Sequence, residues 1–218
     1  MLYKLSTNGA RRSPLLPRLI GALIMLALAW VAPLRATTVV PPDFSTLVND
    51  SDYIVHATVK NVTAEKQTGD YGTRIMTHVE LTIIEVVAGH PPATLTLDLL
   101  GGQVGKERMR VVGMPQFAVG EEHILFVSGN GTNFCPLNRM RHGQYPVLTD
   151  AATGRKYVAR ADRTPLQQAA DVQRPLGEKQ ATALAPTANA TSGAMGPADF
   201  IQQIKAAVQP GGRLERMP

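Results

Sequence analysis

A regularly alternating stretch near the middle of the chain constrains its fold most strongly. Residues 74–87 read RIMTHVELTIIEVV, and apolar side chains, most of them β-branched, occupy one set of alternate positions: Ile75, Val79, Leu81 and Ile83. Such alternation predicts a β-strand with one buried face. The stretch is long for a strand, which favours a coiled strand that bends through a small barrel and pairs with two neighbours. Ile83 and Ile84 are both apolar, which predicts a β-bulge at this point.

Shorter alternating or apolar runs predict the other strands. They cover residues 52–63, 94–100, 123–127, 143–148 and 155–159. A helical turn with Ser45 as its N-cap is expected over residues 43–50, placed over an open barrel end. This order of elements predicts a mainly β domain over residues 37–163, built as a small five-stranded OB-like Greek-key barrel.

The first two long strands supply a candidate binding face. The polar, glycine-containing loop over residues 64–72 predicts a hairpin, and a hairpin centred near Thr68 places His56 opposite Glu80. OB-type barrels often bind ligands on the face of their central strands. The candidate ligand-binding residues on that face are His56, Lys60, Arg74, Met76, His78 and Glu80. The alternative is an ordinary solvated face, whose cross-strand pairs contribute only about 0.2–1 kcal/mol each.

The amino terminus predicts a secretory signal peptide over residues 1–36. Residues 19–32 form an uncharged apolar run that is shorter than the roughly 20 residues a membrane span needs, so a cleaved signal is favoured over an anchor. The basic residues of this segment are Lys4, Arg11, Arg12, Arg18 and Arg35. We therefore expect a secreted or periplasmic protein that meets the membrane only transiently, through its signal peptide.

The net charge of the chain belongs to this signal. The whole sequence has 22 Lys and Arg and 17 Asp and Glu, a formal charge of +5. Removing the five basic residues of positions 1–36, which contain no acidic residue, leaves 17 basic against 17 acidic residues. The mature chain is formally neutral, which argues against a nucleic-acid partner.

The carboxyl-terminal part of the chain changes in composition. Residues 164–196 are rich in Ala, Gln, Thr and Pro and predict a flexible linker. Residues 197–210 predict a short amphipathic helix that begins at a proline, and residues 211–218 form a tail. The apolar stripe of this helix comprises Phe200, Ile201, Ile204 and Val208. Two alternatives stay open for the stripe: it docks onto the barrel, or it binds a partner protein.

The sequence carries no established catalytic or metal-binding motif. It contains no HExxH, no GxSxG and no cysteine-based zinc spacing. The glycine-rich GGQVG at residues 101–105 lacks the Lys-Ser/Thr ending of a phosphate loop, so we interpret it as a backbone turn. Cys135 is the one cysteine and is either a small buried side chain or a reactive thiol. We predict no catalytic residue, no metal site and no cofactor.

Two resemblances rest on these stretches. SDYIVHATVKNV, MTHVELTIIEVVAG and VGEEHILFVSG, within residues 51–147, resemble in pattern the netrin-like domain of the tissue inhibitors of metalloproteinases, which implies an OB-type barrel. Those inhibitors bind the zinc of the protease through a free N-terminal cysteine and carry several disulfides. The mature chain here would begin near Thr37 and has only Cys135, so the inhibitory residues are not carried over.

The second resemblance is to a group of uncharacterised exported bacterial proteins. It is carried by SDYIV, EVVAG, GGQVG, MRVVGMPQFAVGEEHILF, HGQYPV before TDAATGR, and the terminal DFIQQIKAAV. This resemblance covers most of the mature chain. It implies export and the domain boundaries given above, and it implies no mechanism.

These observations favour an exported, non-catalytic binding or interaction module whose ligand is an unknown protein or extracellular polymer. One alternative is a structural accessory protein of the cell envelope, and another is an enzyme with an unrecognised site. His56, His78 and His123 lie on neighbouring predicted strands, and they form a metal or catalytic site only if their faces agree.

Overall fold

The computed structural model describes residues 40–69, 72–177, 191–210 and 213–216, all within one compact unit. The predicted signal peptide and the middle of the predicted linker, residues 178–190, lie outside these described residues. One antiparallel sheet has the strand order β3-β2-β1-β6-β7-β8. Its strands are β1 Tyr53–Gly69, β2 Gly72–Gly89, β3 Leu95–Leu100, β6 Glu122–Val127, β7 Gln144–Thr149 and β8 Lys156–Val158.

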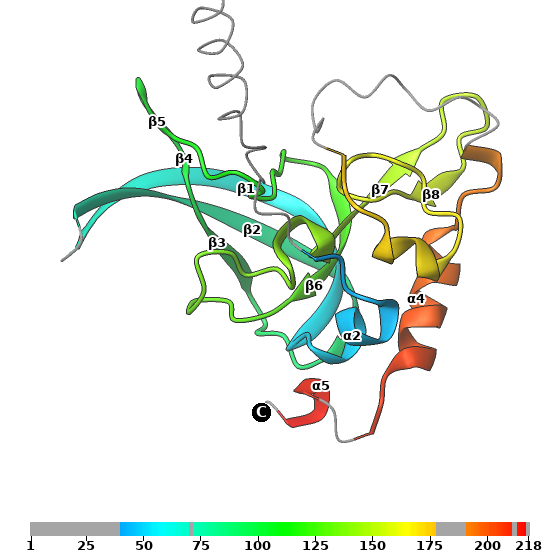
Figure 1. The fold of residues 1–218 in the computed structure, drawn as a ribbon. Helices are drawn as coiled ribbons and strands as arrows, with labels where there is room; N and C mark the ends of the chain where they lie inside the picture. Colours follow the sequence, from blue (N-terminus) through cyan, green and yellow to red (C-terminus); the bar gives the residue numbers. More distant parts are fainter. Residues whose placement is uncertain (1–39, 70–71, 178–190, 211–212, 217–218) are drawn as a thin grey trace, which may run out of the picture. The chain divides into compact units, whose positions relative to one another are not determined.

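Smaller elements surround this sheet (Figure 1). Strands β4 Gly102–Val104 and β5 Glu107–Met109 pair as a second, two-stranded sheet. The helices are α2 Phe44–Asn49, α4 Pro197–Ala207 and α5 Arg213–Arg216, with 3-10 turns η1 Met140–Gly143 and η2 Ala169–Gln173. None of these described helices is long and apolar enough to cross a membrane.

The prediction of a mainly β fold is confirmed, but the sheet does not close into a barrel within the described residues. It ends at β3 on one side and at β8 on the other. Loop groups bond to both edges instead. Leu100 N–H donates to Phe134 O at 2.9 Å at the β3 edge, and Val158 N–H donates to Met195 O at 2.9 Å at the β8 edge. Edge strands whose backbone groups are hydrogen-bonded in this way need no further strand to close the sheet into a barrel.

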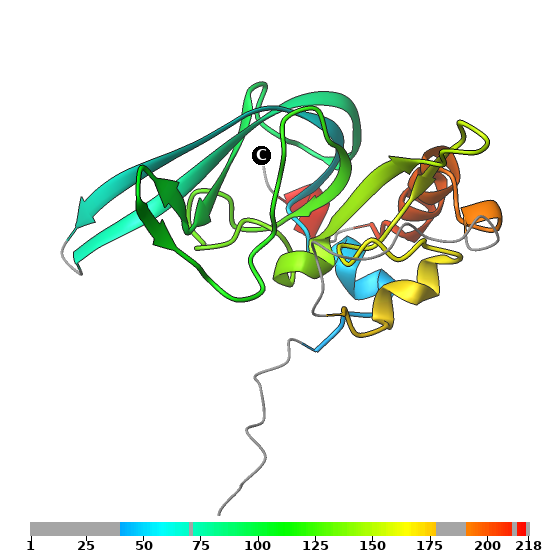
Figure 2. The ribbon, with the colours of Figure 1, turned by 90° about the horizontal axis from the view of Figure 1, so that it is seen from above.

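Strands β1 and β2 run side by side as a long curved ribbon (Figure 2). The predicted bulge is confirmed, because His56 faces Glu85 and Ala57 faces Ile83, which leaves Ile84 as the extra residue. The predicted register is wrong. The paired strands continue to Gly69 and Gly72, and three bulges shift the pairing further, so Glu80 lies opposite Asn61 rather than His56.

The two faces of the sheet carry two apolar clusters. One face of β1 contributes Val55, Ala57 and Val59 to a cluster with the alternating residues of β2 and the inward leucines of β3, as predicted. The other face contributes Ile54, Ile124 and Phe126 to a cluster with α2 and α4. The N-cap of α2 is Asp43 and not Ser45, since Asp43 Oδ1 accepts from Thr46 N–H at 2.8 Å.

Helix α4 docks its apolar stripe onto the sheet. Phe200, Ile201 and Ile204 are buried in the same cluster as Phe126, and Val208 packs against that cluster while partly exposed. Of the two alternatives for this stripe, docking onto the β-domain is the one observed. The candidate partner-binding residues are therefore part of the protein's own core, and they offer little surface to a second protein.

The described parts of the predicted linker also differ from the expectation. Leu166 and Val172 are fully buried, and Leu166 N–H donates to Val158 O at 2.9 Å. Residues 169–173 form the turn η2, closed by a capping box between Gln168 and Asp171. Two large apolar side chains and a few backbone hydrogen bonds are enough to order residues 164–177, and averaged composition does not detect so few contacts.

Candidate functional site

The six predicted ligand-binding residues do not converge on one point. Alternation along β1 and β2 distributes them along one face of the ribbon, as expected, but most of the charged and histidine side chains are paired locally. Lys60 Nζ lies 3.5 Å from Glu80, and His78 Nδ1 lies 2.6 Å from Asp98. Met76 is buried and Arg74 is exposed near the hairpin tip. Surface pairs of this kind contribute roughly 0–1 kcal/mol each.

His78 gives a stability prediction with a defined sign. Its hydrogen bond to Asp98, aided by Glu65, raises the pKa of His78 above its ordinary value of 6.5 despite partial burial. A raised folded pKa adds stability that is fully present below pH 6.5 and is lost as the pH rises through the folded value. We expect Asp98→Asn to destabilise the protein more at about pH 6 than at about pH 9, measured by urea unfolding. An equal loss at both pH values would contradict this assignment.

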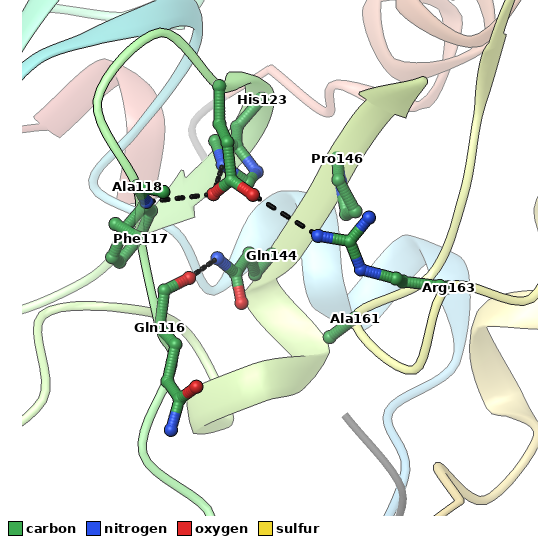
Figure 3. A pocket seen from close by; sticks show the side chains of 9 residues that line it. Gln116, Phe117, Ala118, His123, Gln144, Pro146, Ala161 and Arg163 are labelled. Atoms are coloured by element: carbon green, nitrogen blue, oxygen red, sulfur yellow. Dashed lines mark hydrogen bonds and ion pairs between the residues drawn. The ribbon is translucent and has the colours of Figure 1, made fainter. Parts of the chain in front are cut away.

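A cavity of about 230 Å³ lies beside β6 and β7 (Figure 3). It is lined by Gln116, Phe117, Ala118, Glu121, His123, Gln144, Pro146, Ala161 and Arg163. His123 and Pro146 are direct partners in the β6–β7 ladder. Strand β7 also supplies Gln144, and the loop before β6 and the turn that follows β8 supply the other lining residues. Three segments distant in sequence therefore form the cavity.

Glu121 joins three of these lining residues. Its Oε2 accepts from Ala118 N–H at 2.9 Å and lies 3.3 Å from His123 Nε2, and its Oε1 accepts from Arg163 Nη2 at 3.2 Å. The hydrogen bond from His123 is the main cause that lowers the pKa of Glu121; burial opposes it, and the hydrogen bond from Ala118 N–H and the charge of Arg163 add to it. Glu121 is therefore a carboxylate at neutral pH and can only accept hydrogen bonds.

This network assigns the roles of the two imidazole nitrogens of His123. Because the Glu121 carboxylate only accepts, His123 Nε2 carries the proton, and in the neutral ring Nδ1 is then an acceptor. His123 is 2% exposed, and its Nδ1 has no hydrogen-bond partner among the described residues. An unpaired buried polar atom costs about 1–3 kcal/mol. Nδ1 itself is buried, so the imidazole belongs to the packed wall of the cavity and presents no accessible acceptor to it.

The ring of His123 is held from the side as well. Phe117 packs against it edge-on, with ring centroids 5.2 Å apart and an interplanar angle of 72°. Gln144 donates its side-chain N–H to Gln116 O at 2.7 Å, which ties the loop before β6 to β7 (Figure 3). These contacts hold Phe117, Gln116 and Gln144 in place, so the wall of the cavity is formed in the absence of a ligand.

Arg163 occupies a strained backbone conformation beside the cavity. Its φ of 66° lies in the left-handed region, which costs a non-glycine residue about 1–2 kcal/mol. Arg163 N–H donates to Arg160 O at 2.8 Å, and Arg160 N–H donates to Thr164 O at 2.9 Å, so a tight turn maintains the conformation. This turn brings the guanidinium to Glu121. Strain of this kind is concentrated at functional sites.

A second cluster of the same composition lies on the opposite face of the sheet. Glu122 Oε1 lies 2.7 Å from His56 Nε2, and Glu122 Oε2 accepts from Lys156 Nζ at 2.6 Å. His56, Glu122 and Lys156 are not among the residues that line the cavity. The neighbouring residues Glu121 and Glu122 thus each bind one histidine and one cation, and only the first set faces the cavity. Substitutions in the second set therefore serve as controls for substitutions in the first set.

The three histidines considered together in the sequence do not meet. His56 and His123 belong to opposite faces of adjacent strands, and His78 lies further along the ribbon. In the part of the chain that the structure describes, no group of three or more His, Cys, Asp or Glu side chains is placed to hold a metal ion. Cys135 is buried, and burial raises the pKa of its thiol to about 11, which agrees with the unreactive alternative.

The sequence carries a partial signal for the cavity. His123 is a histidine in an apolar run, directly after two glutamates, but the sequence does not indicate the roles of Glu121, Gln144 and Arg163. Arg163 is 42 positions from Glu121 in the sequence, and only the fold brings the two side chains together. No protein-family model matches this chain, and no curated protein matches its sequence. The resemblance to exported bacterial proteins therefore stays a prediction.

Proposed function

We propose that this protein is an exported, non-catalytic binding module that holds one small polar group of a protein or extracellular polymer in the cavity beside β6 and β7. The observation that carries the proposal is the guanidinium of Arg163, which a left-handed turn and the contact with Glu121 hold at the wall of the cavity. A guanidinium carries five N–H donors, and the contact with Glu121 uses one of them. A bound acceptor group fits the donors that remain.

The size of the cavity supports recognition of one group and not of a whole small molecule. Typical small-molecule sites occupy roughly 300–1,000 Å³, whereas this cavity measures about 230 Å³. One side chain or one substituent of a longer chain fits such a space. OB-type barrels often bind on their central strands. The proposed site instead lies beside β6 and β7, and none of the six predicted ligand-binding residues lines it.

An enzyme is the second candidate, because a histidine oriented by a carboxylate is also the arrangement of a general base. None of the nine lining residues is Ser, Thr, Cys or Lys. Glu121 engages both of its carboxylate oxygens in contacts with the protein. Catalysis here would therefore use a water molecule activated by His123. Binding without chemical change is the simpler function for this set of residues.

The test compares the full chain with Arg163→Gly and with Lys156→Ala. Glycine tolerates the left-handed φ of position 163, so the first variant removes the guanidinium while it relieves backbone strain. Each protein is immobilised and exposed to an envelope extract of the organism that makes it. We expect a component that the wild type and Lys156→Ala retain equally and that Arg163→Gly retains about tenfold less.

Two results would contradict the proposal. Retention that is unaffected by Arg163→Gly, or reduced equally by Lys156→Ala, would place binding outside the cavity. Conversion of the retained component into a new chemical species by the wild type would show catalysis, and the second candidate would then replace the first.

A further inference from the structure

The β1–β2 ribbon extends past the rest of the sheet and leaves one side of β1 without a neighbouring strand. Strand β6 pairs with β1 only from Tyr53 to Thr58, whereas β1 continues to Gly69. The last contact on this side is made by Val59, whose N–H donates to Glu121 O at 2.8 Å. Among the described residues, no strand pairs with this side of β1 beyond that point (Figure 2).

The unpaired side of β1 presents a regular row of backbone donors and acceptors. Val62 N–H donates to the side chain of Asn61 at 2.9 Å and not to β2, so it points away from β2. Because backbone groups alternate along a strand, the N–H and C=O groups of Ala64, Lys66 and Thr68 point the same way. In the described part of the chain these groups have no backbone partner. They repeat about every 6.6–6.8 Å along the strand.

The small β4–β5 sheet supports the ribbon from one face (Figure 1). Strand β4 crosses over the paired residues Ala64 and Thr77, because a Cβ added to Gly102 would lie 3.3 Å from Ala64 Cβ. Lys66 Nζ lies 2.5 Å from Glu107 of β5. A charged lysine is one of the devices that keep other chains away from a sheet edge, and this ion pair neutralises it.

An extended polypeptide is the ligand whose hydrogen-bonding groups match this row. A β-strand carries alternating N–H and C=O groups at the same spacing, and strand addition to an exposed sheet edge is a recurrent mode of peptide recognition. Both neighbours of β1, the strands β2 and β6, run antiparallel to it, so an antiparallel segment continues the sheet. The crossing of β4 over Ala64 favours a small side chain beside that residue.

A second copy of this chain does not fit the edge. Antiparallel pairing of the edge with itself sets two glutamates opposite each other when it is centred on Glu65, and two lysines when it is centred on Lys66, which is unfavourable. A pairing centred on Ala64 brings Gly69 of the second copy against Val59, whose backbone is already bonded to the loop before β6. Pairings centred nearer to the hairpin tip join too few residues. The partner is therefore a different chain.

We propose that the free edge of β1 over residues 62–68 is a strand-addition site, where an extended segment of another protein pairs antiparallel with β1 and places a small side chain beside Ala64. The site is separate from the cavity beside β6 and β7, since none of residues 62–68 lines that cavity. The inference therefore goes beyond the proposed function and does not depend on it.

The test titrates the ¹⁵N-labelled full chain with a peptide of sequence Thr-Val-Thr-Ala-Thr-Val-Thr-Lys, blocked at both ends. Its control has Pro-Pro in place of the central Ala-Thr, which removes a donor from each edge of the strand. We expect the first peptide to shift the amide signals of Ala64, Lys66 and Thr68. The amides of Thr63 and Glu65 face β2 and are expected to move less. The proline peptide is expected to bind about tenfold more weakly.

Two variants of one residue separate the backbone from the side chain. Lys66→Pro and Lys66→Ala both lose the ion pair with Glu107, but only proline lacks the N–H that points away from β2. Proline is tolerated on an edge strand where its N–H would face solvent, so the ribbon is expected to stay folded. We expect Lys66→Ala to bind the peptide as the wild type does, and Lys66→Pro to bind it about tenfold more weakly.

Three results would overturn the inference. Equal affinity for the two peptides, or equal affinity of the two variants, would exclude backbone pairing at this edge. Absence of any shift in residues 62–68 of the wild type would do so whether or not Lys66→Pro folds. Self-association of the wild type in sedimentation, lost in Lys66→Pro, would show that a second copy occupies the edge instead. The effect of Arg163→Gly on retention still tests the cavity in each case.

Discussion

Replacing Phe200 with alanine is expected to lower the free energy of unfolding by about 3–5 kcal/mol. Phe200 is fully buried, and its ring lies 5.2 Å from that of Tyr145, 5.9 Å from that of Phe44 and 6.2 Å from that of Phe126, measured between centroids. It thus connects α4 to α2 and to the sheet. Its truncation leaves a cavity where three elements meet, and urea unfolding measures the loss.

The matched control is Gln203→Ala on the same helix. Gln203 is exposed, and glutamine and alanine differ little in helix propensity, so we expect a change within about 0.5 kcal/mol. If Phe200→Ala were also within that range, α4 would not be part of the folded core. The free partner-binding helix considered from the sequence would then be the correct description.

Replacing Glu121 with alanine is expected to abolish binding and to destabilise the protein by about 1–3 kcal/mol. The substitution removes the acceptor for His123 Nε2 and leaves a 2%-exposed imidazole with both nitrogens unpaired. It also releases Arg163, whose guanidinium is held at the cavity by Glu121. Retention of the envelope component and urea unfolding report the two effects separately.

Glu122→Ala is the control for this variant. It removes the partner of a buried histidine and of a cation in the same way, on the opposite face of the sheet. We expect a similar loss of stability with unchanged binding. Equal loss of binding in both variants would mean that the glutamates act through stability alone, and the cavity would no longer be a distinct site.

Local pattern predicted the strands well, because a half-buried strand records its faces in alternate residues. The inward positions of β1, β2 and β3 and the bulge at Ile84 could all be predicted in this way. The absence of barrel closure and the register of β1 against β2 could not be predicted in this way. They depend on where the hairpin turns, on two further bulges, and on loop groups such as Phe134 O that bond to the sheet edge.

The cavity was harder to predict than the fold. A histidine in an apolar strand is usually a satisfied core residue, and nothing local shows that the Nδ1 of His123 lacks a partner. Arg163 is the last residue of the predicted β domain, directly before the segment whose composition predicts a linker. Its role depends on a left-handed turn that places it against Glu121, and pairing over such a distance has no periodic signature.

The central claim is that Glu121 fixes the tautomer of His123, with the proton on Nε2, in the wall of the cavity. Long-range ¹H–¹⁵N NMR correlation of the histidine rings in their neutral form measures this directly. The account predicts a proton on Nε2 of His123 and none on Nδ1. A proton on Nδ1 would contradict it.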